Sequence, residues 1–183
     1  MSMFHSNTER LIDYWRSLGG DGRLPTRMAV NPADFAEVMS QVFITGRVAT
    51  GVYPLRLVGG LVAELHQRDL RQQNLLGLFR ERDRLDLKAA LETARRRPEP
   101  VVTQVDALTD GPVLPLEILF LPLAAAADSP ERYLGLYQPL AMVARLRGLP
   151  IREFALRRVT GLGPSNVESP RLRLAALDGR RIA

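Results

Sequence analysis

The segment from Leu114 to Leu123 is apolar on both of its sides, and this constrains the fold more than any other feature of the chain. In a β-strand, alternate side chains point to opposite faces of the sheet. One face would carry Leu116, Ile118 and Phe120, and the other Glu117, Leu119 and Leu121. A strand with two apolar faces must be covered on both sides. We therefore expect this segment to lie inside a sheet that has a packed layer on each face.

Further strands and helices are predicted on both sides of this segment. Apolar runs rich in β-branched residues predict strands, and the turn Asp110-Gly111-Pro112 predicts a hairpin. The predicted strands are residues 42–48, 52–58, 101–108, 113–123 and 133–139, and the helices between the second and third are residues 61–67, 75–79 and 83–97. This order predicts an α+β fold with a five-stranded antiparallel sheet and helices on one face.

An amphipathic helix over residues 7–18 is predicted to flank the sheet. Its apolar stripe consists of Leu11, Tyr14, Trp15 and Leu18. This stripe is a natural cover for the sheet face of Leu119 and Leu121, so these six residues are the predicted interface. The helix packs there within one chain, or the same surface also joins two copies in a homodimer or binds a partner protein.

The chain is predicted to divide into three parts. The N-terminal helix occupies residues 1–22 and ends in a glycine-rich break. The sheet and its helices occupy residues 23–148, and the first element predicted in this part is a second short helix over Pro32–Gln41. A basic extension then occupies residues 149–183.

Several local motifs along the chain resemble one protein family. They are residues 5–11 with Tyr14 and Trp15, and residues 31–35, 53–59, 68–76, 116–123 and 172–179. In these segments, and in its order of helices and strands, the chain resembles the PAS domain, in particular the single-domain bacterial PAS proteins of the PAS_5 group. The resemblance implies a sensory, regulatory or protein-interaction role, and it supplies no catalytic residues.

The chain has no cysteine, which restricts the cofactors that such a domain can hold. A flavin that forms a thiol adduct and a thioester-linked chromophore both require one, so neither is possible. Haem is not expected, because the predicted helix over residues 83–97 has no histidine and His66, at a helix end, is expected to be solvated or capping. A zinc site would need both His5 and His66 with carboxylates, and no metal site is predicted. Non-covalent flavin, an apolar metabolite and an empty core remain open.

The predicted lining of an interior pocket consists of Leu57, Leu65, Leu87, Leu91 and Val102. These residues either fill a solid core or surround an apolar small molecule. No enzymatic activity is expected, because no serine or threonine is paired with a histidine and a carboxylate in a recognisable arrangement.

The net charge of +5 invites a nucleic-acid function, but the charge is unevenly placed. Seven arginines and three acidic residues follow residue 148, so this stretch supplies four of the five positive charges. Binding of a polyanion through this extension is the alternative function, although the extension lacks interleaved aromatic residues. A structural subunit of a larger assembly is a third possibility.

A cytoplasmic location is expected, without contact with a membrane. Glu9, Arg10 and Asp13 interrupt the apolar run that a signal peptide needs. The longest apolar stretch, residues 113–127, contains Glu117 and is too short to span a bilayer.

Overall fold

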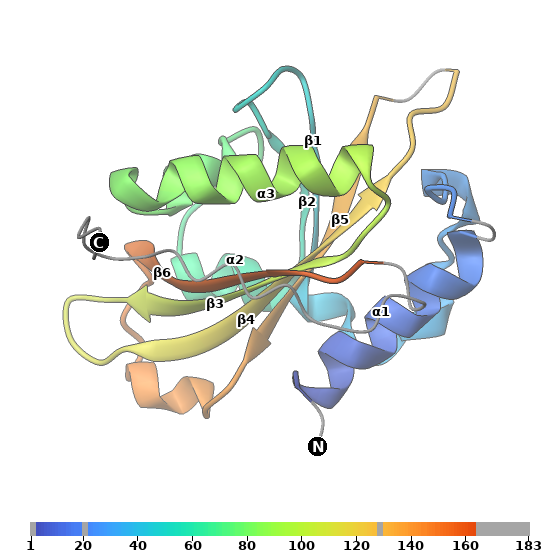
Figure 1. The fold of residues 1–183 in the computed structure, drawn as a ribbon. Helices are drawn as coiled ribbons and strands as arrows, with labels where there is room; N and C mark the ends of the chain where they lie inside the picture. The colour runs from blue at the N-terminus through green and yellow to red at the C-terminus, as the bar shows by residue number, and fades with distance from the viewer. Residues whose placement is uncertain (1–2, 20–21, 128–129, 164–183) are drawn as a thin grey trace, which may run out of the picture.

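The computed structural model describes residues 3–19, 22–127 and 130–163, and it has the α+β architecture that the sequence predicts (Figure 1). The helices are α1 (Ser6–Gly19), α2 (Gly60–His66) and α3 (Arg84–Arg96), with short 3₁₀ helices η1 (Arg27–Ala29), η2 (Pro32–Gln41), η3 (Leu75–Leu78), η4 (Glu81–Asp83) and η5 (Val143–Leu146). The strands are β1 (Val42–Gly46), β2 (Leu55–Val58), β3 (Val101–Leu108), β4 (Leu114–Leu123), β5 (Arg132–Pro139) and β6 (Glu153–Gly161). None of the described helices is long and apolar enough to cross a membrane.

All strands belong to one antiparallel sheet in the order β2-β1-β5-β4-β3-β6. The predicted grouping of two strands, a helical crossover and three strands is confirmed, since α2 and α3 connect β2 to β3. The segment over residues 47–54 is a hairpin loop closed by the Ala49–Val52 bridge, so β1 and β2 are shorter than predicted.

The sheet has a sixth strand, which is a correction to the predicted five. β6 pairs with β3 along the edge of the sheet, so the sheet continues past residue 148 into the predicted basic extension. Arg157 and Arg158 lie exposed on this edge strand. Because these polar residues interrupt any apolar run, the sequence pattern did not predict a strand here. Residues 164–183, with four of the seven arginines, lie outside the described residues.

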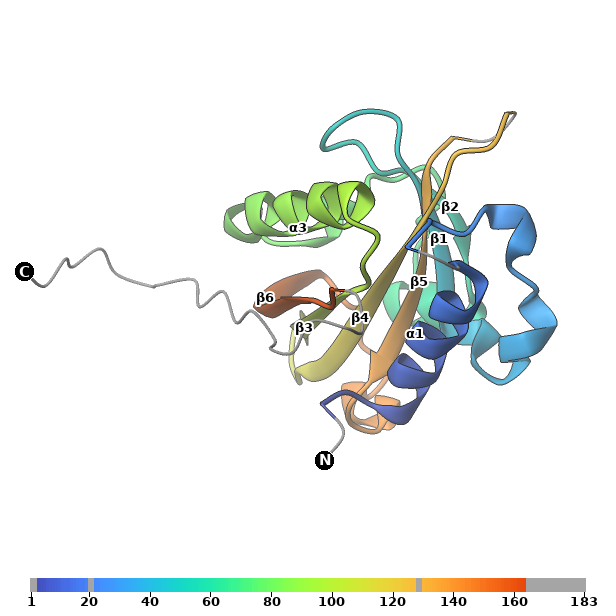
Figure 2. The same cartoon turned by 45° about the vertical axis from the view of Figure 1, so that its right-hand side comes forward.

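Both faces of the sheet are covered, as the two apolar sides of β4 require (Figures 1 and 2). On one face, Leu116, Ile118 and Phe120 pack beneath α2 and α3. On the other face, Leu119 and Leu121 pack beneath α1 and η2. Asn31 caps η2, because its side-chain oxygen accepts a hydrogen bond from Ala33 N at 3.2 Å.

A glycine at the centre of the sheet makes room for an aromatic ring. Gly135 on β5 lies directly opposite Phe43 on β1, and the Phe43 ring lies where a side chain at residue 135 would be. The ring is fully buried and makes edge contacts with Phe120 and Tyr137 at centroid distances of 5.8 and 5.4 Å. The interior therefore depends on the absence of a Cβ at this position.

We expect Gly135→Ala to lower the free energy of unfolding by about 1–3 kcal/mol, because the new methyl group overlaps buried ring atoms and forces strain. A Cβ at this site would lie 2.0 Å from Phe43 Cζ. Urea denaturation measures the change. Gly60→Ala, at the exposed start of α2 where nothing lies within 4 Å, is the control and should leave stability within about 0.5 kcal/mol of wild type. Equal stability of the two variants would contradict this account of the core.

Candidate functional site

The predicted pocket residues do not all meet in one place. Leu65, Leu87 and Leu91 are buried together between the sheet and helices α2 and α3. Val102 lies on the opposite face, because its neighbour Val101 already points toward α3 and side chains alternate along β3. Leu57 is 38% exposed on the edge strand β2, and it lies opposite Ile44, which belongs to the cluster on the α1 face. Neither Val102 nor Leu57 lines the interior between the sheet and helices α2 and α3.

Aromatic side chains fill the interior around these leucines. Tyr137 and Phe154 contact each other edge to face at 5.6 Å, and Phe79 packs on Phe154 at 5.2 Å. An open hollow at the surface is lined by charged residues, namely Arg80, Glu81, Arg82 and Glu153. That hollow lacks the apolar lining predicted for a small-molecule site.

His66 lies inside this aromatic cluster, whereas the sequence predicts a solvated or capping residue. Only 2% of its surface is exposed, because Phe154 and Tyr137 cover the end of α2. Its Nε2 lies 3.4 Å from the Tyr137 hydroxyl. Burial, with a smaller contribution from Arg68, lowers the pKa of His66 to about 4, so the ring is neutral near pH 7.

The predicted interface residues lie in one cluster on the other face of the sheet. Leu11, Trp15, Leu119 and Leu121 are buried there within the single chain, and Tyr14 and Leu18 are partly buried beside them. This arrangement corresponds to the intramolecular alternative, in which α1 itself covers the sheet. The additional use of this surface between two copies stays a prediction.

Specific polar contacts hold α1 in place on the sheet. Glu117 of β4 is 2% exposed, and its Oε2 accepts hydrogen bonds from His5 N at 3.0 Å and from Thr8 Oγ1 at 2.9 Å. A carboxylate at this position also interacts favourably with the positive end of the helix dipole. Nearer the other end of the helix, Trp15 Nε1 donates to the Pro122 carbonyl at 2.8 Å. These contacts fix both the position and the rotation of α1.

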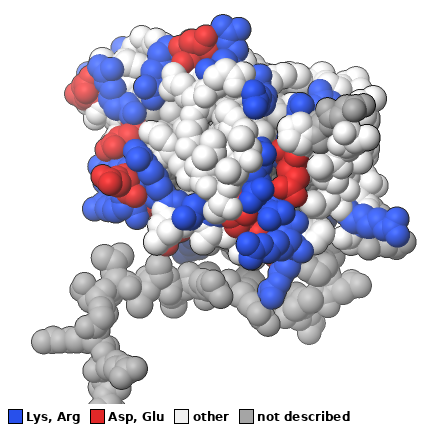
Figure 3. All heavy atoms as spheres, turned by 90° about the horizontal axis from the view of Figure 1, so that it is seen from above, with Lys and Arg blue, Asp and Glu red and all other residues white. Residues whose placement is uncertain are grey.

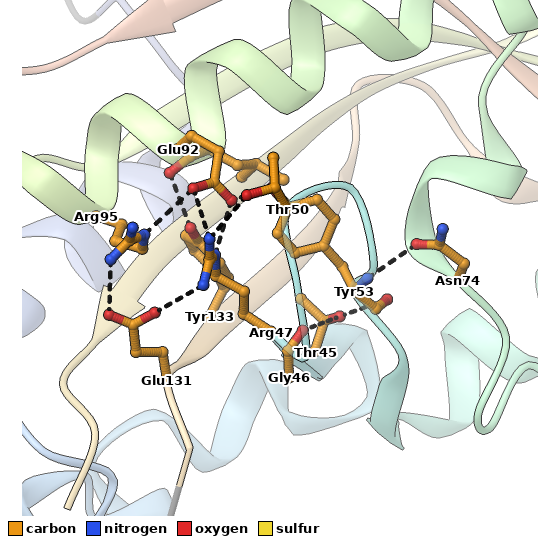
Figure 4. Close-up of polar contacts among 11 residues, drawn as sticks. Thr45, Gly46, Arg47, Thr50, Tyr53, Asn74, Glu92, Arg95, Glu131 and Tyr133 are labelled. Atoms are coloured by element: carbon orange, nitrogen blue, oxygen red, sulfur yellow. Dashed lines mark hydrogen bonds and ion pairs between the residues drawn. The ribbon is translucent and has the colours of Figure 1, made fainter.

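The most developed polar cluster of the described residues joins α3 to the β1–β2 hairpin (Figure 4). Glu92 of α3 is only 7% exposed, and its carboxylate accepts hydrogen bonds from both Nε and Nη2 of Arg47, at 2.8 and 3.0 Å. The Tyr53 hydroxyl donates to the same carboxylate at 2.6 Å. Arg95 bridges Glu92 to Glu131, just before β5, with distances of 3.3 and 3.0 Å. We call Arg47, Tyr53, Glu92, Arg95 and Glu131 the Glu92 cluster.

The charges of the Glu92 cluster compensate one another. The hydrogen bonds from Arg47 are the main reason that the pKa of Glu92 falls to about 2, against the effect of its burial. Burial and the bond to Glu92 raise the pKa of Tyr53. Glu92 is thus charged near pH 7, and the cluster clamps the hairpin, α3 and the start of β5 together.

Sequence reasoning missed the Glu92 cluster and the roles of Glu117 and His66. Glu92 lies directly after Leu91, beside the apolar stripe of α3, and this position is the only signal that the sequence offers. The described residues contain no group of three or more His, Cys, Asp or Glu side chains placed to hold a metal ion.

Most of this chain matches one known protein family. The family model PAS_5, described as PAS domain, matches residues 3–138, a range that begins just before α1 and ends at the next-to-last residue of β5. No curated protein matches the chain.

We expect Glu92→Gln to lower the free energy of unfolding by about 1.5–3 kcal/mol at neutral pH, because it removes the charge from several hydrogen bonds. The folded-state pKa of Glu92 is depressed, so its contribution is complete above about pH 5 and is lost as the pH falls toward about 2. Denaturant titrations of both proteins at a series of pH values should therefore converge in acid.

The matched control for this experiment is Glu64→Gln, on the exposed side of α2, which should change stability by less than about 0.5 kcal/mol. A constant gap between wild type and Glu92→Gln from neutral pH into acid would show that charge is not the source of the effect.

Proposed function

Because this chain belongs to the PAS_5 family of PAS domains, we propose that it is a non-enzymatic sensory or regulatory module that acts through contacts with other proteins. The observation that carries the proposal is the attachment of α1 to the outer face of the sheet. In this proposal the helix leaves that face when a partner protein, or a second copy in a homodimer, takes its place. The cytoplasm is the proposed location.

The balance of forces on α1 supports a helix that can detach. Docking orders 14 residues and buries only a few large side chains, chiefly Leu11, Ile12 and Trp15. The gain from burial is offset by the lost conformational entropy of the helix. Detachment therefore costs less than unfolding the sheet, which is the requirement for a population shift between two states.

The surface beneath α1 supports replacement of the helix by another protein. Removal of α1 would expose the apolar side chains of β4 and β5, including Leu119, Leu121 and Leu134. An exposed apolar sheet face of this kind favours association. Glu117 would lose its two hydrogen bonds but would gain water, so its charge does not prevent detachment.

The alternative of polyanion binding gains little support from the described part of the predicted extension. Arg152 is paired with Asp110, and Arg157 with Asp106, so these cations are already neutralised. The remaining argument for it would depend on Arg158, which lies exposed on β6, and on residues 164–183, which lie outside the described residues.

Hydrogen exchange tests the proposal directly. We expect the amides of α1 to exchange through a local opening of the helix. The free energy of this opening should lie below the opening free energy measured for the amides of β4 and β5. Thr8→Val removes one bond to Glu117 and should lower the opening free energy of α1 by about 1–2 kcal/mol, with no change in the sheet.

Ser17→Ala is the control, because this hydroxyl bonds only within the exposed side of α1. Its effect on exchange of the buried α1 amides should be small. The proposal fails if α1 exchanges only through global unfolding, that is, with the same free energy as β4 and β5 in wild type and in Thr8→Val.

A further inference from the structure

An arginine on the α1 side of the sheet carries a buried donor that no described residue accepts. Arg132 is the first residue of β5, and by strand alternation its side chain lies on the same face as Leu134 and Leu136, beneath α1 and η2. The Nε atom of Arg132 is buried and has no hydrogen-bond partner among the described residues. A buried N–H without an acceptor costs free energy, so this position favours a ligand that supplies one.

A second arginine reaches the same place because the residue opposite Arg132 is a glycine. Gly46 of β1 is the Cα partner of Arg132, so the side-chain positions of the two residues lie next to each other on one face, about 5 Å apart. A Cβ built on Gly46 would lie 3.2 Å from Nε and 3.7 Å from Cγ of Arg56. The side chain of Arg56 therefore occupies the space above Gly46, beside Arg132.

An irregularity in the sheet directs Arg56 toward this space. Ile44 pairs with Leu57 and the next residue, Thr45, pairs with Leu55, so Arg56 is an extra residue in the register of β1 and β2. Bulges of this kind change the direction in which a side chain points. The position of Arg56 over Gly46 is therefore built into the backbone of the edge strand.

The two guanidinium groups have no carboxylate partner among the described residues. Neither Arg56 nor Arg132 takes part in any of the ion pairs found there. Nη1 of Arg56 donates to the neutral side-chain oxygen of Gln72 at 2.7 Å. Two like charges side by side repel each other, and an anion between them would remove that repulsion. We call Gly46, Arg56 and Arg132 the Gly46 site.

Carboxylates close to these arginines in the chain or on a neighbouring segment are already paired. Glu131, which precedes Arg132, is held by Arg47 and Arg95, and Asp69 is held by Arg71. Figure 3 views the end of the molecule from which the β1–β2 hairpin protrudes in Figure 1, and Lys and Arg side chains cover more of this surface than Asp and Glu. The surroundings therefore attract anions.

We propose that the Gly46 site binds a phosphate group, either as the free ion or as part of a small phosphate ester. A phosphate group carries a charge of about −1.5 to −2 at pH 7, which matches two guanidinium groups, whereas one carboxylate would match only one. Arginine donors also suit the planar, paired contacts that phosphate oxygens accept. The proposal depends on residues of β1, β2 and β5 alone, so it does not require detachment of α1.

Isothermal titration calorimetry of the full chain in a low-salt buffer at pH 7.5 tests the proposal, with inorganic phosphate and phenyl phosphate as the two probes. We expect saturable binding that weakens as sodium chloride is added, because salt screens the attraction. Arg56→Met and Arg132→Met should each weaken binding about tenfold, since each removes charge-assisted hydrogen bonds. Tighter binding of phenyl phosphate would identify an ester as the ligand, and tighter binding of inorganic phosphate the free ion.

Two controls separate this site from general attraction to a basic protein. Arg158→Met removes an exposed arginine of β6 and should bind phosphate as wild type does. In phosphate-free buffer, Arg132→Met should keep the melting temperature of wild type, because the described structure gives Arg132 no partner to lose. Arg56→Met, at an exposed position, keeps the test valid if Arg132→Met fails to fold.

Three results would overturn the proposal. The first is the absence of saturable binding by wild type, and the second is equal affinity of wild type, Arg56→Met and Arg132→Met. The third concerns Asp128, which lies four positions before Arg132 in the chain and outside the described residues. Binding of phosphate only after Asp128→Asn would show that this carboxylate, and not a ligand, neutralises the site.

Discussion

Coverage of two apolar faces by one chain is the constraint on which the rest of this structure depends. β4 and β5 form the middle of the sheet, and their side chains are buried in both directions. A single layer of helices would leave half of these residues in water, at a cost of about 25 cal/mol for each Å² of apolar surface. The crossover helices α2 and α3 cover one face, and α1 with η2 covers the other. The N-terminal helix is therefore part of the folded domain and not an appendage.

Apolar contact alone does not determine where a helix lies on a smooth sheet, and here a buried carboxylate supplies the position on each face. Glu117 accepts hydrogen bonds from His5 and Thr8 at the start of α1, and Glu92 of α3 accepts hydrogen bonds from Arg47 of the β1–β2 hairpin. The two sites differ in what they allow. Glu117 would simply be hydrated if α1 left, whereas separation of the Glu92 cluster would break several charge-assisted bonds at once. This difference is why the proposed movement is that of α1.

Much of the fold was predictable because it is encoded in local patterns. The alternation in β4, the stripe of α1 and the turn at Asp110-Gly111-Pro112 depend on neighbouring residues alone, and all three match the structure. The candidate site was less predictable. Leu65, Leu87 and Leu91 lie in one buried cluster, whereas Val102 lies on the other face of the sheet, because strand alternation fixes only relative orientation. β6 was missed because an edge strand with exposed arginines lacks the apolar pattern of a central one.

The sequence by itself determined the order of the elements, the need for cover on both faces of the sheet and the exclusion of cofactors that require cysteine. The tertiary structure alone decided which charged groups became buried. Glu92 finds Arg47 across 45 positions of the chain, and Thr8 finds Glu117 across 109. His66 enters an aromatic cluster that includes Phe154 from the missed strand. Such pairings arise when the fold brings strands and helices together in space. No local pattern of residues encodes contacts between positions so far apart in the chain.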